Sequence, residues 1–430
     1  MLDRLFKLSA NHTTIGTEVL AGATTFLTMA YIIFVNPTIL ADAGMDKGAV
    51  FVATCLAAAF GSAIMGLWAN YPIALAPGMG LNAYFSYSVV LGMGHSWQVA
   101  LGAVFISGVA FLLLALTKVR EAIINAIPHS LKLAISAGIG LFLGIIALKN
   151  AGLIAAHPAT LVTMGDVTKP EALLAAGGFM AMVALDVRKV PGAIMIAILG
   201  TTALGMALGV TPWGGLVSAP PSLAPTFLAM DLAGAVNVGL VAIVFAFLFV
   251  DLFDNAGTLI GVAHRAGMLD AKGRLPRIER ALVSDSLAAM ASGALGTSTT
   301  TSYIESAAGI KAGGRTGLTA VVVAGFFLLA LFLSPLAGSI PAYATAPALL
   351  FVACLMARGL ADIAWDDMTE AVPAVVTALA MPLTFSIAHG ISFGFIAFAG
   401  IKLLAGKGRD VSPTVALLSL AFVAKYALLR

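Results

Sequence analysis

Three carboxylates stand in apolar sequence, where a charge is costly. Asp251 and Asp254 lie three residues apart in Phe249-Val-Asp-Leu-Phe-Asp-Asn-Ala-Gly-Thr-Leu-Ile-Gly, and Glu305 follows a run of Thr and Ser. A spacing of three places Asp251 and Asp254 on one face of a helix. A charged side chain at the bilayer centre costs ~3 kcal/mol even on the most lenient scale. We therefore expect these groups to be functional.

The three carboxylates have the chemistry of proton carriers. Burial and a neighbouring carboxylate both favour the protonated form of a carboxyl group. Such a group can bind a proton on one side of a membrane, release it on the other, and accept hydrogen bonds from ligand N–H groups. The sequence therefore predicts Asp251, Asp254 and Glu305 as proton-coupling residues. The alternatives are a structural polar cluster that joins helices, and Na⁺ coordination by carboxylate and Thr oxygens. No other metal site is predicted, because no His stands at ligand spacing beside them.

The apolar stretch 72–93 is interrupted at its start. Pro72 and Pro77 cannot donate backbone hydrogen bonds, and Gly78 and Gly80 relax the backbone further. The first part of the stretch cannot form a good helix, so we expect a helix to begin near Gly80. Non-helical backbone at membrane depth is tolerated only where it is buried in protein or lines a cavity.

The stretch 297–310 is interrupted in a different way. It opens with Thr297-Ser-Thr-Thr-Thr-Ser, and these residues favour extended or capping conformations over a helix interior. We expect a helix to begin around Ser302 and to run through Glu305. Two half-helices whose N-termini meet near the middle of the membrane would present N–H groups and positive dipole ends to a ligand. The alternative is a pair of interfacial re-entrant loops.

A polar stripe runs along the first apolar stretch, 17–40. Its members are Thr24, Thr25, Thr28, Tyr31 and Asn36. The hydroxyls either line a site or bond to carbonyls of their own helix, and the pattern favours neither. The chain has no P-loop, zinc motif or nucleophile triad, which argues against an ATP-driven pump and against an enzyme that hydrolyses its substrate in the membrane.

The composition is that of a multi-span helical membrane protein. Of 430 residues, 60% are hydrophobic and only 10% are charged, and the mean hydropathy is +1.03. A soluble domain carries about 25% charged residues, so this chain has no large surface for water. The net charge of +3 gives no sign of a surface for nucleic acid.

Fourteen candidate spans can be read from the sequence, followed by an apolar tail at 411–428. The spans are 17–40, 49–68, 72–93, 97–117, 131–149, 171–187, 191–209, 235–263, 281–295, 297–310, 317–335, 342–357, 370–388 and 390–405. With the N-terminus in the cytoplasm, most of the 23 lysines and arginines fall on the cytoplasmic side, and only Lys47, Lys149 and Lys169 on the outer side. This bias predicts a multi-pass protein of the cell inner membrane with a cytoplasmic N-terminus. It also favours a tail that stays on the cytoplasmic face.

Two halves can be recognised in the order of the spans. The second span contains Leu56-Ala-Ala-Ala-Phe-Gly-Ser-Ala, and the ninth contains Leu287-Ala-Ala-Met-Ala-Ser-Gly-Ala. Each precedes an interrupted span. Because each half has seven spans, an odd number, the second half must be inverted, which is the 7+7 plan of secondary transporters.

Four stretches of this sequence resemble one known family. They are Phe26 to Pro37, Ala76-Pro-Gly-Met-Gly-Leu-Asn-Ala-Tyr-Phe, Asp251-Leu-Phe-Asp-Asn-Ala-Gly-Thr-Leu and Thr301-Ser-Tyr-Ile-Glu-Ser-Ala-Ala-Gly. The family is that of the AzgA-like hypoxanthine–adenine–guanine permeases, a branch of the nucleobase–cation symporters. The resemblance implies a core domain (1–118 and 235–336) that moves against a gate domain (119–234 and 337–410), with 411–430 as a tail. It also implies purine import by proton symport, a homodimer and no cofactor.

The resemblance also implies roles for particular residues. Asn82, Asp251 and Glu305 should bind the purine, with Asp254 tuning affinity or proton binding. Gly80 and Thr301, from the same motifs, and Thr25, from the polar stripe of the first span, complete the predicted substrate-binding set. The rival interpretations are a carrier of the same fold for uracil, xanthine or a small anion, and a channel. An anion carrier should have a basic residue in its site, and none stands in these motifs.

Overall fold

The computed structural model describes residues 2–117, 127–236, 241–265, 268 and 275–428. The chain divides into two compact units. Unit 1 consists of Met1–Leu116 and Lys149–Ala348, and unit 2 of Thr117–Leu148 and Leu349–Arg430. The predicted core and gate domains were defined by the inverted repeat, whereas these two units are defined by packing. The core and gate boundaries therefore stay a prediction.

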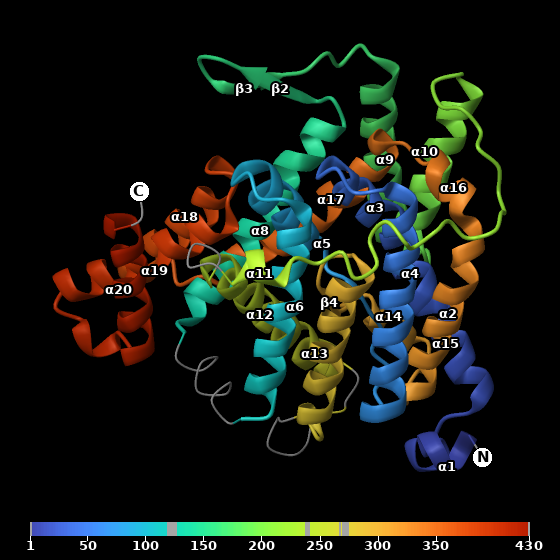
Figure 1. The fold of residues 1–430 in the computed structure, drawn as a ribbon, viewed down its shortest axis with the longest axis horizontal. Coiled ribbons are helices and arrows are strands. Elements are labelled where there is room, and N and C mark those ends of the chain that lie inside the picture. Colours follow the sequence, from blue (N-terminus) through green and yellow to red (C-terminus); the bar gives the residue numbers. More distant parts are fainter. Residues whose placement is uncertain (1, 118–126, 237–240, 266–267, 269–274, 429–430) are drawn as a thin grey trace. The chain divides into compact units, whose positions relative to one another are not determined.

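Helices make up most of both units (Figure 1). The helices and strands of unit 1 are α1 (Leu2–Phe6), α2 (Ile15–Met29), α3 (Ile32–Asp42), α4 (Lys47–Ile64), β1 (Leu75–Pro77), α5 (Met79–Ala83), α6 (Trp97–Ala115), β2 (Ile154–His157), β3 (Leu161–Met164), α9 (Pro170–Val187), α10 (Ala193–Ala207), α11 (Leu232–Ala235), α12 (Val241–Arg265), α13 (Ile278–Leu295), β4 (Thr300–Ser302), α14 (Ser306–Lys311), α15 (Gly317–Ala330) and α16 (Ser334–Ser339). Two π-helical segments, η2 (Met65–Ala69) and η3 (Tyr84–Gly92), continue α4 and α5.

Unit 2 is smaller and entirely helical over the residues described. Its helices are α8 (His129–Asn150), the second part of α17 (Ala342–Ala357), α18 (Met368–Leu383), α19 (Ile387–Leu404) and α20 (Pro413–Leu428). α8 begins here and ends in unit 1. Four short 3₁₀ segments are also present among the described residues: η1 (Ser9–Asn11) and η5 (Leu331–Leu333) in unit 1, and η6 (Arg358–Asp362) and η7 (Gly408–Asp410) in unit 2.

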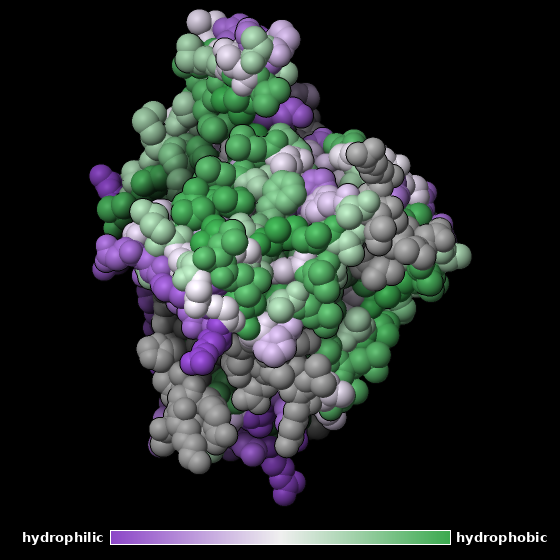
Figure 2. All heavy atoms as spheres, turned by 90° about the vertical axis from the view of Figure 1, so that its left-hand side faces the viewer, coloured by the Kyte–Doolittle hydropathy of each residue, from purple (hydrophilic) through white to green (hydrophobic). Residues whose placement is uncertain are grey.

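The helices have the length and surface of membrane spans. Among the described residues, 8 helical stretches are long and apolar enough to cross a membrane, and four shorter apolar helices accompany them. Many large apolar side chains are exposed, among them Leu116, Leu404 and Leu417, and the face drawn in Figure 2 is largely hydrophobic. Such a surface is suited to lipid and not to water. Of the fourteen predicted spans, 72–93 and 297–310 are the interrupted ones, and 281–295 falls on α13, which is not among these apolar stretches. Each of the other predicted spans falls on one of them.

The packing inside unit 1 repeats itself with the two halves exchanged. α4 packs against α15, and its counterpart α13 packs against α6, as Figure 1 shows. α4 and α13 also pack against each other. A Cβ built on Gly61 would lie 3.0 Å from the Cβ of Ala288, so the two matching Ala- and Gly-rich motifs are in contact. This exchange of partners is what an inverted repeat produces.

The two interrupted spans meet as a pair of short strands. β1 and β4 are antiparallel and fully buried, with Leu75 opposite Ser302 and Pro77 opposite Thr300. Two bonds extend the pairing: Gly78 N donates to Thr299 O at 3.0 Å, and Tyr303 N donates to Ala74 O at 3.0 Å. Backbone that is not helical thus obtains its hydrogen bonds from the opposite half of the chain, as the membrane interior requires.

The helices that follow these strands begin close to the predicted positions. α5 begins at Met79, one residue before the predicted start near Gly80. The second prediction was wrong in detail, because α14 begins at Ser306 and Glu305 is its N-cap residue. Tyr303 N is used by the strand pairing, so the backbone cannot enter a helix at Ser302. Since the strands are antiparallel, α5 and α14 lead away from the pair in opposite directions.

α20 lies alongside α19 in unit 2. Ser419 Oγ donates to the carbonyl of Phe395 at 2.9 Å, and the Tyr426 ring lies 5.6 Å from that of Phe393 and 5.9 Å from that of His389. Residues later in α20 therefore contact residues earlier in α19, which means that the two helices are antiparallel. The sequence did not indicate this packing.

Candidate functional site

Several buried polar atoms around the strand pair have no hydrogen-bond partner among the described residues. They include Asn82 Nδ2, Thr25 Oγ1, Tyr84 Oη, Thr299 Oγ1 and Thr301 Oγ1. A buried donor or acceptor without a partner costs about 1–3 kcal/mol. Such atoms are rare in folded proteins, and their gathering on the elements that flank β1 and β4 makes this region the candidate ligand site.

Glu305 is held in position by a tyrosine from the opposite half. It lies at the start of α14 and is half-buried, and Tyr31 Oη donates to its Oε1 at 2.6 Å. Tyr31 is fully buried in the turn between α2 and α3. The second carboxylate oxygen, Oε2, can accept a hydrogen bond from an N–H group of a ligand.

Asn82 is oriented by a chain of hydrogen bonds. Ser298 Oγ donates to Asn82 Oδ1 and lies 3.4 Å from Asn36 Oδ1. Asn36 Nδ2 in turn donates to Thr54 Oγ1 and Thr297 Oγ1, both at 2.7 Å. Because the Asn82 oxygen is engaged, its amide nitrogen is the part that is available. The side chain is therefore a hydrogen-bond donor, which suits a ring nitrogen or a carbonyl oxygen.

Asp251 belongs to a second network, on the α12 side of β4. Asn255 Nδ2 donates to Asp251 Oδ1 at 2.8 Å and also to Asp285 Oδ2. Ser302 N donates to Asn255 Oδ1 at 3.0 Å. Ser302 stands three residues before Glu305 in the chain, so this network and Glu305 are joined through β4. One helical turn before Asp251, Phe247 packs edge to face on Tyr84, with ring centroids 4.8 Å apart.

Three other predicted site residues, Thr25, Thr301 and Gly80, lie on α2, β4 and α5. Thr25 faces α14, where a Cβ on Gly309 would lie 2.1 Å from its Oγ1. Thr301 is paired with Ala76, and its methyl group lies against Gly78. Gly80 lies in α5 and is partly exposed. The side chain of Asp254 lies outside those that the structure describes.

Sequence reasoning missed several buried polar residues, some of them members of these networks and one, Glu18, outside them. Asp285 is completely buried in α13, and a charged residue inside an apolar stretch was a signal for it. Glu18 is also completely buried, and it accepts hydrogen bonds from Arg315 N, Thr316 N and Thr319 Oγ1 at 2.8, 3.2 and 2.6 Å. Ser298 and Asn255 gave no signal in the sequence beyond their place in the quoted motifs.

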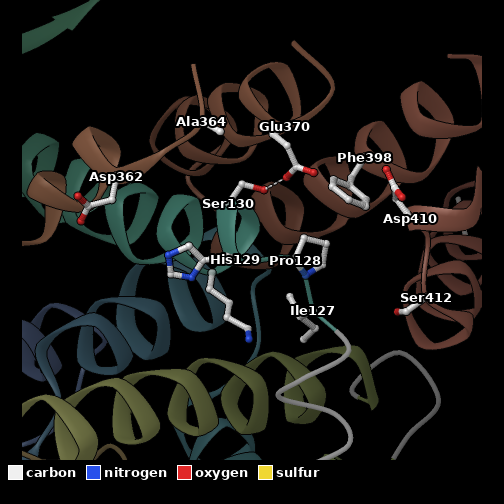
Figure 3. A pocket seen from close by; sticks show the side chains of 11 residues that line it. Ile127, Pro128, His129, Ser130, Asp362, Ala364, Glu370, Phe398, Asp410 and Ser412 are labelled. Atoms are coloured by element: carbon white, nitrogen blue, oxygen red, sulfur yellow. Dashed lines mark hydrogen bonds between the residues drawn. The ribbon is translucent and has the colours of Figure 1, made fainter. Parts of the chain in front are cut away.

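Unit 2 contains a cavity of about 660 Å³ that is unrelated to these residues. Residues from both chain segments of unit 2 line it, among them Ser130 from the first segment and Glu370 and Asp410 from the second (Figure 3). Glu370 accepts from Ser130 Oγ and pairs with Lys402 at 2.7 Å. Lys402 is 3.6 Å from Asp410 as well. Since Lys402 pairs with both acidic residues, the cavity resembles a structural ion cluster more than a site for a neutral ligand.

Comparison with known proteins agrees with the fold and the motifs. The chain matches the Permease family over residues 16–393. It is 52% identical over 425 residues to the adenine permease AdeP of Escherichia coli (strain K12), with 99% of this chain and 96% of that protein covered. It is 46% identical over 441 residues to the guanine/hypoxanthine permease PbuG of Bacillus subtilis (strain 168), with 100% of both covered.

Among solved structures, the transmembrane domain of the cyanobacterium bicarbonate transporter BicA has a TM-score of 0.64 at 17% identity, covering 90% of this chain and 97% of that one. At this identity the similarity shows the fold alone, the 7+7 inverted repeat. Family, relatives and fold lead to one conclusion: this multi-pass membrane protein belongs to the Permease family, within the AzgA-like branch whose four motifs it carries.

Proposed function

We propose that this protein is a secondary active transporter that imports purine nucleobases by proton symport. The observation that carries the proposal is the set of side chains at the β1–β4 pair. Asn82 from the first half offers an amide donor, and Glu305 from the second half offers a carboxylate acceptor. A purine carries both ring-nitrogen acceptors and N–H donors, so it complements this set.

The geometry supports distinct roles for the site residues. Glu305 accepts from a purine N–H group, with Tyr31 holding its other oxygen. Asn82 donates to a ring nitrogen or to the carbonyl oxygen of an oxopurine. The rings of Tyr84 and Phe247 give the site an apolar, aromatic wall beside Asp251. Asp251, Asp254 and Glu305 are the proposed proton-coupling residues, and Na⁺ is the alternative coupling ion.

The transport cycle proposed here follows from family membership. The core domain, which carries the strand pair, moves against the gate domain and exposes the site to each side of the membrane in turn. The protein works as a homodimer in the cell inner membrane, with its N-terminus in the cytoplasm. Import rather than export follows from the inward proton gradient of that membrane.

The experiment that tests this proposal is uptake into proteoliposomes. We expect accumulation of radiolabelled adenine, guanine or hypoxanthine under an inward proton gradient, and its collapse on addition of a protonophore. Glu305→Gln should lower uptake about tenfold or more, since ~1.4 kcal/mol of lost interaction is tenfold. Glu171→Gln is the matched control, because Glu171 is an exposed carboxylate at the start of α9. Purine uptake that ignores the gradient would contradict proton symport.

The same assay separates the rival functions. Uracil, xanthine and bicarbonate are tested beside the purines. An anion carrier needs a cationic group at its site, but Arg315, which lies near the end of α14, already donates to the carbonyls of Ile310 and Gly314 at 2.7 Å. A channel would conduct without saturation at low substrate, whereas a carrier saturates.

A further inference from the structure

We propose that Asp285 on α13 is a further proton-binding carboxylate of the transporter, which acts through Asn255 to position β4. This inference rests on the proposed proton symport and deepens it. The four residues Asp251, Asn255, Asp285 and Ser302 are called the amide bridge below.

The amide bridge joins two helices and a strand through one side chain. Asn255 uses both hydrogens of its amide nitrogen, one on Asp251 Oδ1 at 2.8 Å and one on Asp285 Oδ2. Its oxygen accepts from Ser302 N at 3.0 Å. The amide orientation is thus fixed by two carboxylates on one side and an N–H group on the other. The position of Asn255 therefore depends on the state of both acids.

Asp285 also contacts the strand directly. Ser302 Oγ donates to Asp285 Oδ1 at 3.3 Å, so both oxygens of this carboxylate are engaged within the bridge. Ser302 is the last residue of β4, and Glu305 follows three residues later at the start of α14. A change at Asp285 is consequently transmitted to the segment that carries Glu305.

The two carboxylates of the amide bridge are buried, so their charges interact strongly. Asp285 and Asn255 are 0% exposed, and Asp251 is 2% exposed. Two carboxylates that accept from one amide nitrogen lie close together. Like charges repel strongly where water is excluded, so the two groups favour sharing a proton over being ionised together.

The charged and titratable residues of the described elements that pack against α13, and of α12, are as follows. α6, η2, β1 and β4 contain no Asp, Glu, His, Lys or Arg, and α4 contains only Lys47, at its first residue, and Cys55, a buried thiol. On α12 the charged or titratable residues are Asp251, Asp254, His264 and Arg265, the last two at its C-terminal end. Next to β4, Tyr303 Oη donates to Pro77 O at 2.6 Å. On α13 itself, Glu279 and Arg280 lie in the first turn, and the Arg280 guanidinium lies over the Trp68 ring at 5.6 Å.

The proton balance of the step is simple. A proton from one side of the membrane forms an O–H bond on the Asp251–Asp285 pair, and the pair re-ionises when the site opens to the other side. With a proton bound, one carboxylate oxygen becomes a donor and can no longer accept from Asn255 or Ser302 in the same way. The amide bridge then holds β4 less firmly, and the position of Glu305, which binds the purine, changes with it.

The test compares accumulation with exchange. Asp285→Asn should bind labelled purine within about threefold of the wild type and should exchange internal for external purine without a gradient. It should lose proton-driven accumulation at least tenfold, and its uptake should depend less on pH between 5 and 8. Asp285→Glu should restore part of the pH dependence.

Two further variants separate a proton-binding role from a structural one. Ser302→Ala removes the hydroxyl donor but keeps the backbone N–H, so it should alter the pH profile in the same direction by a smaller amount. Glu18→Gln is the matched control: it changes a fully buried carboxylate of the same unit, away from β4, and should leave the pH profile unchanged.

Three results would overturn the inference. Asp285→Asn could retain wild-type accumulation and pH profile. It could lose binding, exchange and accumulation alike while Ser302→Ala leaves the pH profile untouched, which would make the bridge a structural anchor only. Wild-type uptake that ignores the proton gradient would overturn the proposed function itself, and that outcome is seen before any variant is made.

Discussion

Two tyrosine–carboxylate pairs in unit 1 are chemically alike but differ in their surroundings. Tyr31 Oη donates to Glu305 and Tyr87 Oη to Asp42, both at 2.6 Å. Both tyrosines are buried, whereas Glu305 stands at the candidate site and Asp42 is exposed at the end of α3. The second pair can therefore serve as an internal reference for the first.

Tyr31→Phe should weaken transport through loss of a single hydroxyl. The variant keeps the ring and its packing but leaves Glu305 Oε1 without its donor, so the carboxylate is less well oriented toward the purine. A hydrogen bond to a charged group contributes about 1.5–3 kcal/mol, so we expect KM for purine uptake to rise at least tenfold. Tyr87→Phe should leave KM within about twofold. Equal effects of the two variants would argue against a role for Tyr31 in binding.

The charge of Asp367 should affect stability in a defined pH range. Hydrogen bonds from the Thr369 hydroxyl and from Lys407 hold the pKa of Asp367 below its usual range. A lowered pKa in the folded state gives stability that is present above the ordinary value of about 4 and is lost as pH falls below it.

Asp367→Asn isolates that contribution, because Asn is as good an N-cap for α18 as Asp. We expect the variant to melt slightly below the wild type at pH 7 in detergent, and the difference to shrink as the pH approaches 3. A difference that stays constant with pH would show that the charge of Asp367 is not its source.

The residues that carry the site were predictable, while their partners were not. Asp251, Glu305 and Asn82 are signalled by unusual residue types in apolar sequence. Tyr31 lies 274 positions from Glu305, and Asn36 lies 261 positions from Thr297. Such pairs leave no local pattern, because they depend on which helices meet.

At the level of elements, α15 and η2, the segment that continues α4, approach each other so closely that only glycine fits at one point. A Cβ on Gly317 would lie 1.9 Å from the carbonyl oxygen of Gly66, and one on Gly66 would lie 2.4 Å from that of Gly317. Small residues of this kind allow helices to pack tightly in lipid.

Gly317→Ala should therefore destabilise unit 1. The added methyl group must push the backbones apart, and overpacking of this kind costs about 1–3 kcal/mol. We expect a lower melting temperature in detergent. Gly325→Ala is the control, because a Cβ at Gly325, also in α15, has no heavy atom within 4 Å; it should be neutral or slightly stabilising. Equal melting of both variants would show that the contact is looser than the structure indicates.

The interruption of two spans followed from Pro, Gly, Thr and Ser, but the pairing of β1 with β4 did not. Strand pairing is specified by the backbone, and three-residue strands have no hydrophobic period of their own. The extended segments that precede the two half-helices pair with each other, because each needs backbone hydrogen bonds that the other supplies. The hairpin of β2 and β3 was likewise missed, since its exposed residues carry little alternation.

For the whole molecule, the tail raises a question of topology. The count of lysines and arginines favours a tail on the cytoplasmic face. The packing of α20 along α19, from Phe395 back to His389, favours a helix that enters the membrane beside its neighbour. Its exposed side chains, including Leu417, Leu420 and Val423, are apolar.

Reporter fusions at the C-terminus decide between these two arrangements. From the packing, we expect α20 to cross, so a fused alkaline phosphatase should be active and a fused green fluorescent protein dark. Fusions at the turn between α19 and α20, near Gly408, should give the opposite pattern. Fluorescence at both positions would show that α20 does not cross and that the charge bias sets the topology.

The span count and the inverted repeat were predictable because hydropathy and small-residue motifs are properties of whole segments. The two units defined by packing were not, since they depend on contacts between segments that lie far apart in the sequence.

A purine has no two-fold axis, whereas the β1–β4 pair relates two halves of the chain by a pseudo-two-fold axis. After a gene duplication, the copies can keep a common backbone, but they must diverge wherever each meets the ligand. Asn82 in one copy and Glu305 in the other show that divergence: an amide on one side and an acid on the other. Paralogues with different cargo are then expected to share the strand pair and to differ in the few side chains around it, so that new substrates arise without a new scaffold.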